Sequence, residues 1–394
     1  MTNKKRSIVR RTRFPRSAST PVVPPLQPSV VYASADVDEL DAQYRGDLEG
    51  YTYAREGHPN ATILADKIDW LEGADGGIIT GAGMAAISLV FLSILKPGDH
   101  IVAGNQLYGR SLRLLTGDLR RMGVSCTLVD PSDVDAVALA VTRQTRLILV
   151  EVVSNPTLRV ADINAVAKVA AGHGVLFMVD NTFTTPRAFR PFRHGADIVV
   201  HSVTKMLSGH SDVTLGYVAA RDGEMNQDLR EVAVTWGLTP SPFDCWLADR
   251  GLNTFELRYD RAQENARRLA GVLGDLDGVA KVIYPGRDDH PDRRLATELL
   301  GDNTGNMLSL ELKGGRDSVN RFIRAASGLP FAPTLGDVST LLSHPASSSH
   351  RALTPTEREA LGISEGLIRI STGIEEIQLL EDTIGGAIRA AAFS

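Results

Sequence analysis

Short apolar runs alternate with amphipathic helical patterns from about residue 61 to residue 220, and this alternation limits the possible folds more than any other feature. Such runs are typical of buried strands, and helices between successive strands favour a mostly parallel sheet with helices on both faces. We therefore expect an α/β domain. The predicted strands lie at 76–80, 99–104, 124–130, 145–152, 174–181, 196–202 and 214–220, and the helices at 84–95, 111–122, 134–142 and 163–172.

The pattern changes after about Gly251. Polar-faced helical segments at 258–276, 318–329 and 374–391 accompany two predicted strands, at 303–315 and 365–372, which indicates a smaller α+β domain. Prolines between residues 21 and 28 indicate extended chain near the N-terminus. We predict an N-terminal arm at 1–60, a large ligand-binding domain at 61–250 and a small domain at 251–394.

The composition is that of a globular protein: 394 residues, 43% hydrophobic, with a net charge of −5. It gives no reason to expect nucleic acid or a membrane surface, and no apolar stretch reaches the roughly 18 residues that span a bilayer. Cys126 and Cys245 lie outside any metal-ligand pattern, which favours reduced thiols in the cytoplasm and no metal. The first 16 residues carry seven basic side chains and no acid. We interpret this segment as a mobile or partner-embracing arm, with an organelle transit peptide as the alternative.

A glycine-rich turn at Gly81–Ala86 follows a predicted strand and precedes a predicted helix, and it fits the G-x-G-x-x-A fingerprint of dinucleotide binding. That fingerprint also needs an acid at the end of the next strand, where this chain has Asn105 and Gln106. An NAD-binding enzyme is therefore a distant alternative. Free N–H groups at a helix N-terminus attract phosphate in general, which predicts a phosphate near Gly83 and Met84.

Two polar residues follow apolar runs: Asp180 ends one run, and Lys205 lies just beyond the next. Open α/β sheets bind ligands at this edge, where the strands have their carboxyl ends. An acid there can simply cap a helix, and a single lysine is usually a solvated surface cation. Lys205, however, has hydroxyl residues around it and the expected phosphate nearby. A lysine amine, an acid for a ring nitrogen and a phosphate cup are what pyridoxal 5'-phosphate (PLP) requires.

The chain resembles the Cys/Met-metabolism family of PLP-dependent enzymes, which includes cystathionine synthases and lyases, methionine γ-lyase and O-acylhomoserine sulfhydrylases. The resemblance runs from about residue 20 to 390, and seven motifs carry it in order: YTYAREGHPN, GAGMAAI, NQLYGRS, EVVSNPTLRVADI, VDNTF, ADIVVHSVTKMLSGHSD and EGLIRISTGIE. It implies the aminotransferase-like fold (fold type I), PLP as cofactor and an amino acid as substrate. It also implies a homotetramer built as a dimer of dimers, in which the arm reaches the neighbouring subunit and two chains share each active site.

The resemblance assigns roles to individual residues. Lys205 would bind the cofactor and carry a proton between Cα and Cβ, Tyr108 would lie on the cofactor ring and act as acid and base near the leaving group, and Asp180 would keep the ring nitrogen protonated. The other implied cofactor contacts are Gly83, Met84, Thr182, Ser202 and Thr204, with Tyr53 and Arg55 reaching the phosphate of the neighbouring subunit. The implied substrate contacts are Arg369, on the α-carboxylate, together with Asn155 and Thr334.

The chain departs from the family pattern at the substrate end. Arg110 stands where relatives have Gly or Cys, and Arg113 occupies the position that holds the distal carboxylate in cystathionine enzymes. The two arginines indicate a polar or anionic distal group on the substrate. The equal alternative is that they lie on a solvated helix face. His58 stands where Asn is usual, either as a packing replacement or as a group that tunes the pocket near neutral pH. Pro333 stands where Glu is frequent. Thr334 stands where Ser is usual, and its backbone N–H can still bind the carboxylate.

These features predict γ-elimination or γ-replacement on a γ-substituted L-amino acid of the cystathionine, methionine or O-acylhomoserine type. β-Elimination is the alternative within the same chemistry. A non-catalytic PLP-binding homologue is a distant alternative, which the presence of Tyr108 disfavours because a binding protein needs no acid or base at that position.

Overall fold

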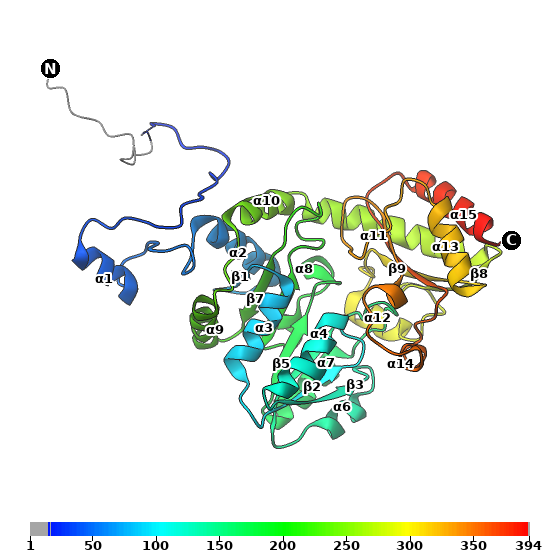
Figure 1. Ribbon diagram of the computed structural model, residues 1–394, viewed down its shortest axis with the longest axis horizontal. Coiled ribbons are helices and arrows are strands. Elements are labelled where there is room, and N and C mark those ends of the chain that lie inside the picture. Colours follow the sequence, from blue (N-terminus) through cyan, green and yellow to red (C-terminus); the bar gives the residue numbers. More distant parts are fainter. Residues whose placement is uncertain (1–14, 16, 393–394) are drawn as a thin grey trace.

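The computed structural model describes residues 15 and 17–392 (Figure 1). The basic segment discussed above therefore lies outside the described residues, except for Pro15. Within residues 15 and 17–392, no helix is long and apolar enough to cross a membrane.

A seven-stranded sheet forms the centre of the larger part of the molecule (Figure 1). Its parallel strands share one direction, and only β7 runs antiparallel to its two neighbours, which confirms the expected mostly parallel sheet. The strand order is β1 (Ile78–Thr80), β7 (Gly216–Ala220), β6 (Ile198–Ser202), β5 (Leu176–Asp180), β4 (Thr145–Glu151), β2 (His100–Gly104) and β3 (Ser125–Val129).

The strands are apolar on both faces because helices cover both sides of the sheet. Along β4, for example, Ile148 and Val150 pack into one hydrophobic cluster, whereas Leu147 and Leu149 pack into another. The first cluster includes side chains of α2 (Pro59–Glu72), α7 (Ile163–His173) and α10 (Pro242–Leu252), and the second those of α3 (Gly83–Ile94) and α9 (Gly223–Trp236). The edge strand β3 is an exception: its residues are exposed or half-buried, so the expectation of a buried strand was wrong there.

A four-stranded antiparallel sheet forms the centre of the smaller part. Its order is β10 (Leu341–Ser343), β11 (Leu367–Ser371), β9 (Met307–Leu312) and β8 (Val279–Ile283), of which β8 and β10 were not predicted. Side chains of α11 (Phe255–Val272), α13 (Gly315–Ala325) and α15 (Ile377–Ala392) complete its hydrophobic core. The domain boundaries at residues 60 and 250 stay a prediction.

Shorter helical segments complete the description. The helix predicted at 111–122 is divided into α4 (Gly109–Arg113), a π-helical turn (Leu114–Asp118) and α5 (Leu119–Arg121). Helix α6 (Val134–Ala140) forms where it was expected, and α8 (Thr185–Ala188) follows β5. The smaller part also contains α12 (Arg293–Leu300) and α14 (Pro355–Ala360).

An arginine side chain of α11 holds the loop that follows β6 in place. Arg258 of that helix is buried and donates hydrogen bonds to the backbone carbonyls of Met206 (2.8 Å) and Gly251 (2.9 Å). Gly209 has a φ of 74°, and a Cβ at that position would lie 1.8 Å from Nη1 of Arg258. Only glycine allows this approach, so the backbone immediately after β6 has a fixed course.

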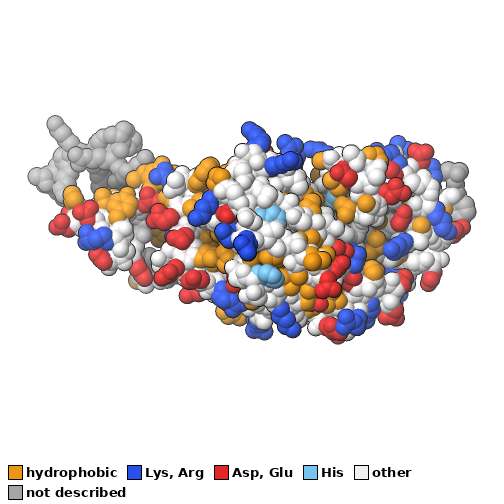
Figure 2. Space-filling view, turned by 90° about the horizontal axis from the view of Figure 1, so that it is seen from below, with side chains coloured by type: hydrophobic (Ala, Val, Ile, Leu, Met, Phe, Trp, Pro, Cys, Tyr) orange, Lys and Arg blue, Asp and Glu red, His pale blue; other side chains and the backbone are white. Residues whose placement is uncertain are grey.

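An extended N-terminal arm projects from the body of the molecule and includes α1 (Val37–Arg45) (Figure 1). Helix α1 has no buried residue within its own chain. Val22, Val31 and Tyr44 are among the exposed apolar side chains of the arm, and Figure 2 shows hydrophobic and acidic side chains together at this end. Exposed apolar surface of this kind is typical of a surface that another protein chain covers.

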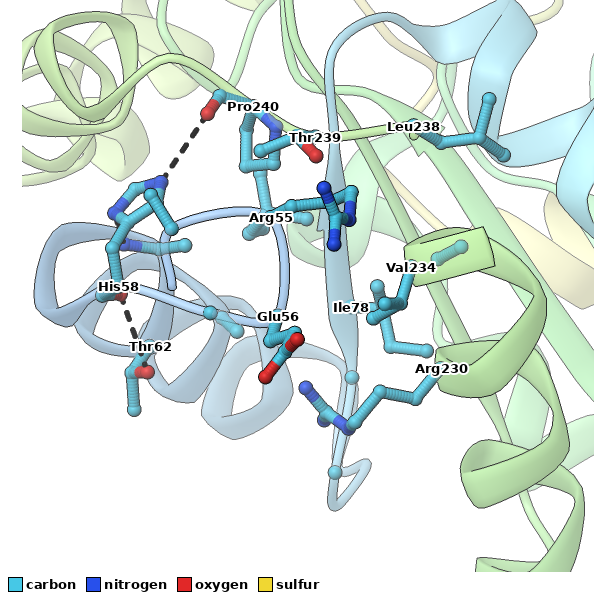
Figure 3. Close-up of a pocket in the computed structure, with 18 of the residues that line it drawn as sticks. Arg55, Glu56, His58, Thr62, Ile78, Arg230, Val234, Leu238, Thr239 and Pro240 are labelled. Carbon is cyan, nitrogen blue, oxygen red and sulfur yellow. Dashed lines mark hydrogen bonds between the residues drawn. The ribbon is translucent and has the colours of Figure 1, made fainter. Parts of the chain in front are cut away.

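His58 caps the N-terminus of α2 (Figure 3). Its Nδ1 accepts a hydrogen bond from the backbone N–H of Ala61 (3.2 Å), and its Nε2 lies 3.2 Å from the carbonyl oxygen of Pro240. The side chain is fully buried, and burial lowers its pKa. It lines a small cavity of about 130 Å³ that is distinct from the larger cavity described below. These contacts support the packing interpretation of His58 and count against a role in tuning the substrate pocket.

We expect His58→Asn to preserve the cap, because Asn also accepts hydrogen bonds from first-turn N–H groups, whereas His58→Ala should lower the free energy of unfolding by about 1 kcal/mol. Urea denaturation of the purified variants measures this difference. Turnover should be the same in both variants. If both substitutions destabilise the protein equally, the imidazole ring of His58 stabilises the protein through packing and not through capping.

Candidate active site

A cavity of about 600 Å³ lies at the carboxyl edge of the large sheet, where the small sheet meets it. The ends of β4, β5 and β6 contribute Glu151, Asp180 and Ser202, and the small sheet contributes Ser343 and Arg369. Parallel strands end at the same edge of a sheet, so side chains from distant parts of the sequence meet here.

The cavity brings together most of the residues predicted from sequence. Its lining includes Gly83, Met84, Tyr108, Arg110, Arg113, Asn155, Asp180, Thr182, Ser202, Thr204, Lys205, Pro333, Thr334 and Arg369. Tyr53 and Arg55 are not part of this lining. The Arg55 guanidinium instead lies 4.9 Å from the centre of the Tyr53 ring, and Arg55 lines the small cavity in Figure 3. Their contact with a neighbouring subunit's cofactor stays a prediction.

Lys205 lies three residues beyond the end of β6 and faces the cavity. Its Nζ donates a hydrogen bond to Oγ1 of Thr334 (3.0 Å). Burial and the positive charge of Arg369 lower the pKa of the Lys205 amine to about 8. A substantial fraction of this amine is therefore neutral and nucleophilic near physiological pH, unlike a surface lysine.

Arg369 reaches the cavity from β11. Its Nη1 donates to Oδ1 of Asn155 (2.9 Å) and its Nη2 to the carbonyl oxygen of Thr334 (2.7 Å), while its buried Nε has no partner among the described residues. Burial lowers the pKa of Arg369 to about 10, so the guanidinium remains charged at neutral pH. A buried cation without an acidic hydrogen-bond partner and with an unused donor is suited to an anionic ligand.

Thr334 differs in detail from the expectation. Its backbone N–H, expected to help bind a substrate carboxylate, donates instead to the carbonyl oxygen of Ala332 (2.8 Å). The groups of Thr334 that contact the site residues are its hydroxyl, which accepts from Lys205, and its carbonyl oxygen, which accepts from Arg369. Thr334 therefore positions these two cations relative to each other.

Glu151 was not predicted from sequence. It ends β4 in register with Asp180 at the end of β5, and its Oε1 accepts a hydrogen bond from the backbone N–H of Tyr108 (2.8 Å). Burial and the charge of Asp180 raise the pKa of Glu151 well above its usual range. Of the two neighbouring carboxyl groups, Glu151 is therefore the one whose ionisation is disfavoured more strongly. Its position at the end of the strand beside the one that ends in Asp180 was the signal that could have identified it.

A buried polar network lies behind Asp180. His201 contacts the carboxylate of Glu72, which also accepts a hydrogen bond from Nδ2 of Asn181 (2.8 Å). Burial raises the pKa of Asp180, whereas hydrogen bonds from Thr182 and the charge of His201 lower it. Burial is the larger effect, so the pKa of Asp180 is raised overall, and a protonated ring nitrogen beside it would supply the positive charge that favours the carboxylate.

The N-terminus of α3 forms one wall of the cavity. Its cap residue, Ala82, makes no side-chain hydrogen bond to the helix, so the first-turn N–H groups lack a side-chain acceptor. A Cβ at Gly83 would lie 2.7 Å from the Cβ of Ser202, so glycine is needed for α3 to approach the end of β6. The hydroxyl of Thr204, which also lines the cavity, donates to the carbonyl oxygen of Leu215 (3.2 Å). The free first-turn N–H groups of α3 suit a phosphate group, whereas the Thr204 hydroxyl already bonds to the backbone of Leu215.

These residues fit PLP. The cavity contains a lysine with a lowered pKa for the aldehyde, a half-buried carboxylate for the ring nitrogen and a helix N-terminus for the phosphate. Tyr108 lies at the wall and is partly exposed. Arg110 and Arg113 are exposed side chains of α4 that line the same cavity, so they do not belong to a helix face that is remote from it.

Known proteins resemble the chain over most of its length. The family model described as Cys/Met metabolism PLP-dependent enzyme matches residues 7–389. The chain is 38% identical to cystathionine beta-lyase of Bacillus subtilis (strain 168) over 368 residues, which cover 93% of this chain and 92% of that protein. It is 37% identical to L-methionine gamma-lyase of Pseudomonas putida over 382 residues, covering 96% of this chain and 95% of that protein.

A solved structure shares the fold. The crystal structure of cystathionine gamma synthase from Xanthomonas oryzae pv. oryzae in complex with cystathionine has a TM-score of 0.89 at 38% identity, covering 94% of this chain and 93% of that chain. These findings confirm the resemblance, the fold class and the cofactor that the sequence motifs implied. The chain therefore belongs to the Cys/Met-metabolism family of PLP-dependent enzymes.

Proposed function

We propose that the protein catalyses γ-elimination or γ-replacement on a γ-substituted L-amino acid that carries a polar distal group. The observation that carries this proposal is the arrangement of Lys205 and Arg369 on Thr334, which places an amine of lowered pKa beside a buried guanidinium. An α-amino acid bound there presents its carboxylate to the guanidinium and its Cα–H to the amine.

Each site residue then has a defined task. Arg369 binds the α-carboxylate and fixes the orientation of the substrate. Bound PLP supplies an electron sink for the charge that develops when the α-proton leaves. The Lys205 amine holds and moves protons at Cα and Cβ, and Asp180 holds the proton of the ring nitrogen. The Tyr108 hydroxyl moves a proton at the leaving group, because its side chain lines the cavity and is partly exposed.

The assembly and location belong to the same proposal. We infer a homotetramer made of two dimers, supported by the exposed apolar side chains of the arm and by the position of Tyr53 and Arg55 outside their own chain's large cavity. A partner's cavity is the site at which these two residues would act. We also infer a cytoplasmic enzyme, because Cys126 and Cys245 are unpaired thiols.

Product analysis tests the proposed reaction. We expect the holoenzyme to convert at least one γ-substituted amino acid to 2-oxobutyrate and ammonia, or to a thioether when a thiol is present, as measured by mass spectrometry. The panel contains cystathionine, methionine, cysteine, O-acetylhomoserine and O-succinylhomoserine. Pyruvate from cystathionine or cysteine would instead support β-elimination, the activity named for the Bacillus subtilis relative.

The matched control is Lys205→Ala. This variant should lose turnover by several orders of magnitude while its circular dichroism spectrum stays unchanged, because the amine contributes one hydrogen bond to the described fold. Undiminished turnover in Lys205→Ala would contradict the role of the amine.

The pH dependence of cofactor uptake provides a second test. Only the neutral amine of Lys205 attacks an aldehyde, so the rate at which the apoprotein takes up PLP should rise with pH and level off above about 8. Stopped-flow absorbance measures this rate. Arg369→Gln removes a positive charge and should move the midpoint to higher pH. A wild-type midpoint near 10.5, the ordinary value for lysine, would contradict the buried environment.

A further inference from the structure

The chain between β4 and α7 forms a short hairpin, residues 153–160, whose two ends form an antiparallel bridge. The backbone N–H of Ser154 donates to the carbonyl oxygen of Arg159 (2.8 Å), and the Ser154 hydroxyl accepts from the backbone N–H of Arg159 (3.0 Å). Asn155 directly follows Ser154, and its Oδ1 accepts a hydrogen bond from Arg369 (2.9 Å). The position of Arg159 in the hairpin therefore determines the position of Asn155 in the cavity.

An ion pair joins this hairpin to the smaller part of the molecule. Asp292 lies between β8 and α12, and its Oδ2 accepts from Nε of Arg159 (2.6 Å) and from the backbone N–H of Val160 (3.0 Å). Its Oδ1 accepts from Nη2 of Arg159 (3.0 Å). The side chain of Asp292 is only 10% exposed. A two-pronged contact in a nearly buried position is much stronger than an exposed ion pair.

Arg159 also contacts a loop of the larger part. Its Nη2 donates to the hydroxyl of Ser132 (3.0 Å), and its Nη1 lies 3.6 Å from Oδ2 of Asp130. Hydrogen bonding to Asp292 raises the pKa of Arg159, so the guanidinium stays charged. One arginine thus joins the hairpin, the loop after β3 and the segment before α12. None of these residues has a task in the proposed reaction.

The small sheet holds the same hairpin near its tip. The hydroxyl of Ser309 on β9 donates to the carbonyl oxygen of Pro156 (2.7 Å), and Ser309 pairs in register with Arg369 on β11. The smaller part therefore contacts the hairpin at its base through Asp292 and at its tip through Ser309 and Arg369. The orientation of the Arg369 guanidinium depends on Asn155, and Asn155 depends on both ends of the hairpin.

We infer that Arg159 and Asp292 are positioning residues for substrate binding: their ion pair fixes Asn155 and thereby orients Arg369 toward the substrate α-carboxylate. This inference rests on the proposed function, since that function places the α-carboxylate on Arg369. A two-pronged contact between a guanidinium and a carboxylate requires a narrow range of orientations, so a less constrained Arg369 binds the carboxylate more weakly. The ion pair should not affect how the amine or the side chain of a ligand is bound.

L-Norleucine and 1-aminopentane test this selectivity, because they differ only in the carboxylate. Their dissociation constants are measured with the holoenzyme from the change in its visible absorption spectrum. Asp292→Asn keeps the shape of the side chain but removes its charge. We expect Asp292→Asn to weaken norleucine binding about tenfold and 1-aminopentane binding less than about twofold. Asp292→Glu retains the charge and should bind norleucine within about threefold of the wild type.

A double-mutant cycle tests whether the two residues act as a pair. Arg159→Gln should weaken norleucine binding about as much as Asp292→Asn. The double variant should be no weaker than either single variant, because all three lack the same contact. Losses that add up in the double variant would overturn the inference.

The matched control is Asp260→Asn. Arg187 of α8 and Asp260 of α11 also form a two-pronged ion pair between the larger and smaller parts, with Nε–Oδ1 and Nη2–Oδ2 distances of 3.0 Å. Among the described residues, neither side chain of this pair is hydrogen-bonded to the hairpin. Asp260→Asn should leave both dissociation constants unchanged. An equal loss of norleucine affinity in Asp260→Asn and Asp292→Asn would overturn a specific role of Asp292.

Two further results would overturn the inference: unchanged norleucine affinity in Asp292→Asn, or an equal loss of affinity for both ligands. In the second case the ion pair only stabilises the fold, which thermal unfolding followed by circular dichroism measures independently. If Asp292→Asn does not fold, Arg159→Lys takes its place. Arg159→Lys keeps the charge but not the two-pronged contact, and it should weaken norleucine binding selectively by about threefold.

Failure of the proposed function gives a different result. Arg369→Gln should abolish the preference for norleucine over 1-aminopentane. An unchanged preference in Arg369→Gln would place the carboxylate elsewhere and overturn both proposals. A selective effect of Asp292→Asn, combined with the absence of any oxo-acid product from the substrate panel, would overturn the proposed reaction and support the positioning role.

Discussion

Arg369 links the small sheet to the large sheet across the cavity, and the chemistry of the site depends on this link. Its guanidinium is buried and bonded only to neutral oxygens, those of Asn155 and Thr334. A buried charge without a counter-charge is unfavourable, and a bound carboxylate relieves that cost. The same cation lowers the pKa of Lys205. A substrate carboxylate cancels this repulsion, so the amine becomes more basic when the substrate is in place.

The parallel strands impose a second constraint, because they bring two carboxyl groups to the same edge of the sheet. Glu151 and Asp180 are in register and cannot both ionise easily in a buried site. The structure treats them differently. Glu151 accepts a hydrogen bond from the Tyr108 backbone and has the more strongly raised pKa, whereas Thr182 and His201 offset part of the rise in the pKa of Asp180. One carboxyl group thus positions the Tyr108 turn, and the other remains available to a ring nitrogen.

The sequence predicted those features that depend on local pattern. The strands before Asp180 and Lys205 are continuous apolar runs, so their ends were apparent. Glu151 also ends an apolar run, but its importance depends on the register between two strands, which no local pattern contains. His58 caps α2 through the nearby N–H of Ala61, but its contact with the carbonyl oxygen of Pro240 depends likewise on distant backbone. Strand β10 was missed because it has only three residues, and β8 was missed because the exposed Ala280 and Lys281 interrupt its apolar run.

Burial differs between the floor of the cavity, where side chains are buried or half-buried, and its entrance, where they are exposed. This difference explains why the family was apparent from the sequence but the substrate was not. At the floor, Arg369 and Asp180 are buried or half-buried among hydrogen-bond partners, so a substitution there leaves buried polar groups, such as Oδ1 of Asn155, without a partner and is destabilising. At the entrance, Arg110 and Arg113 are exposed, and exposed substitutions change stability by only about 0.5 kcal/mol. The entrance can therefore change without loss of the fold, and Arg110 and Pro333, which depart from the family pattern, both line the cavity.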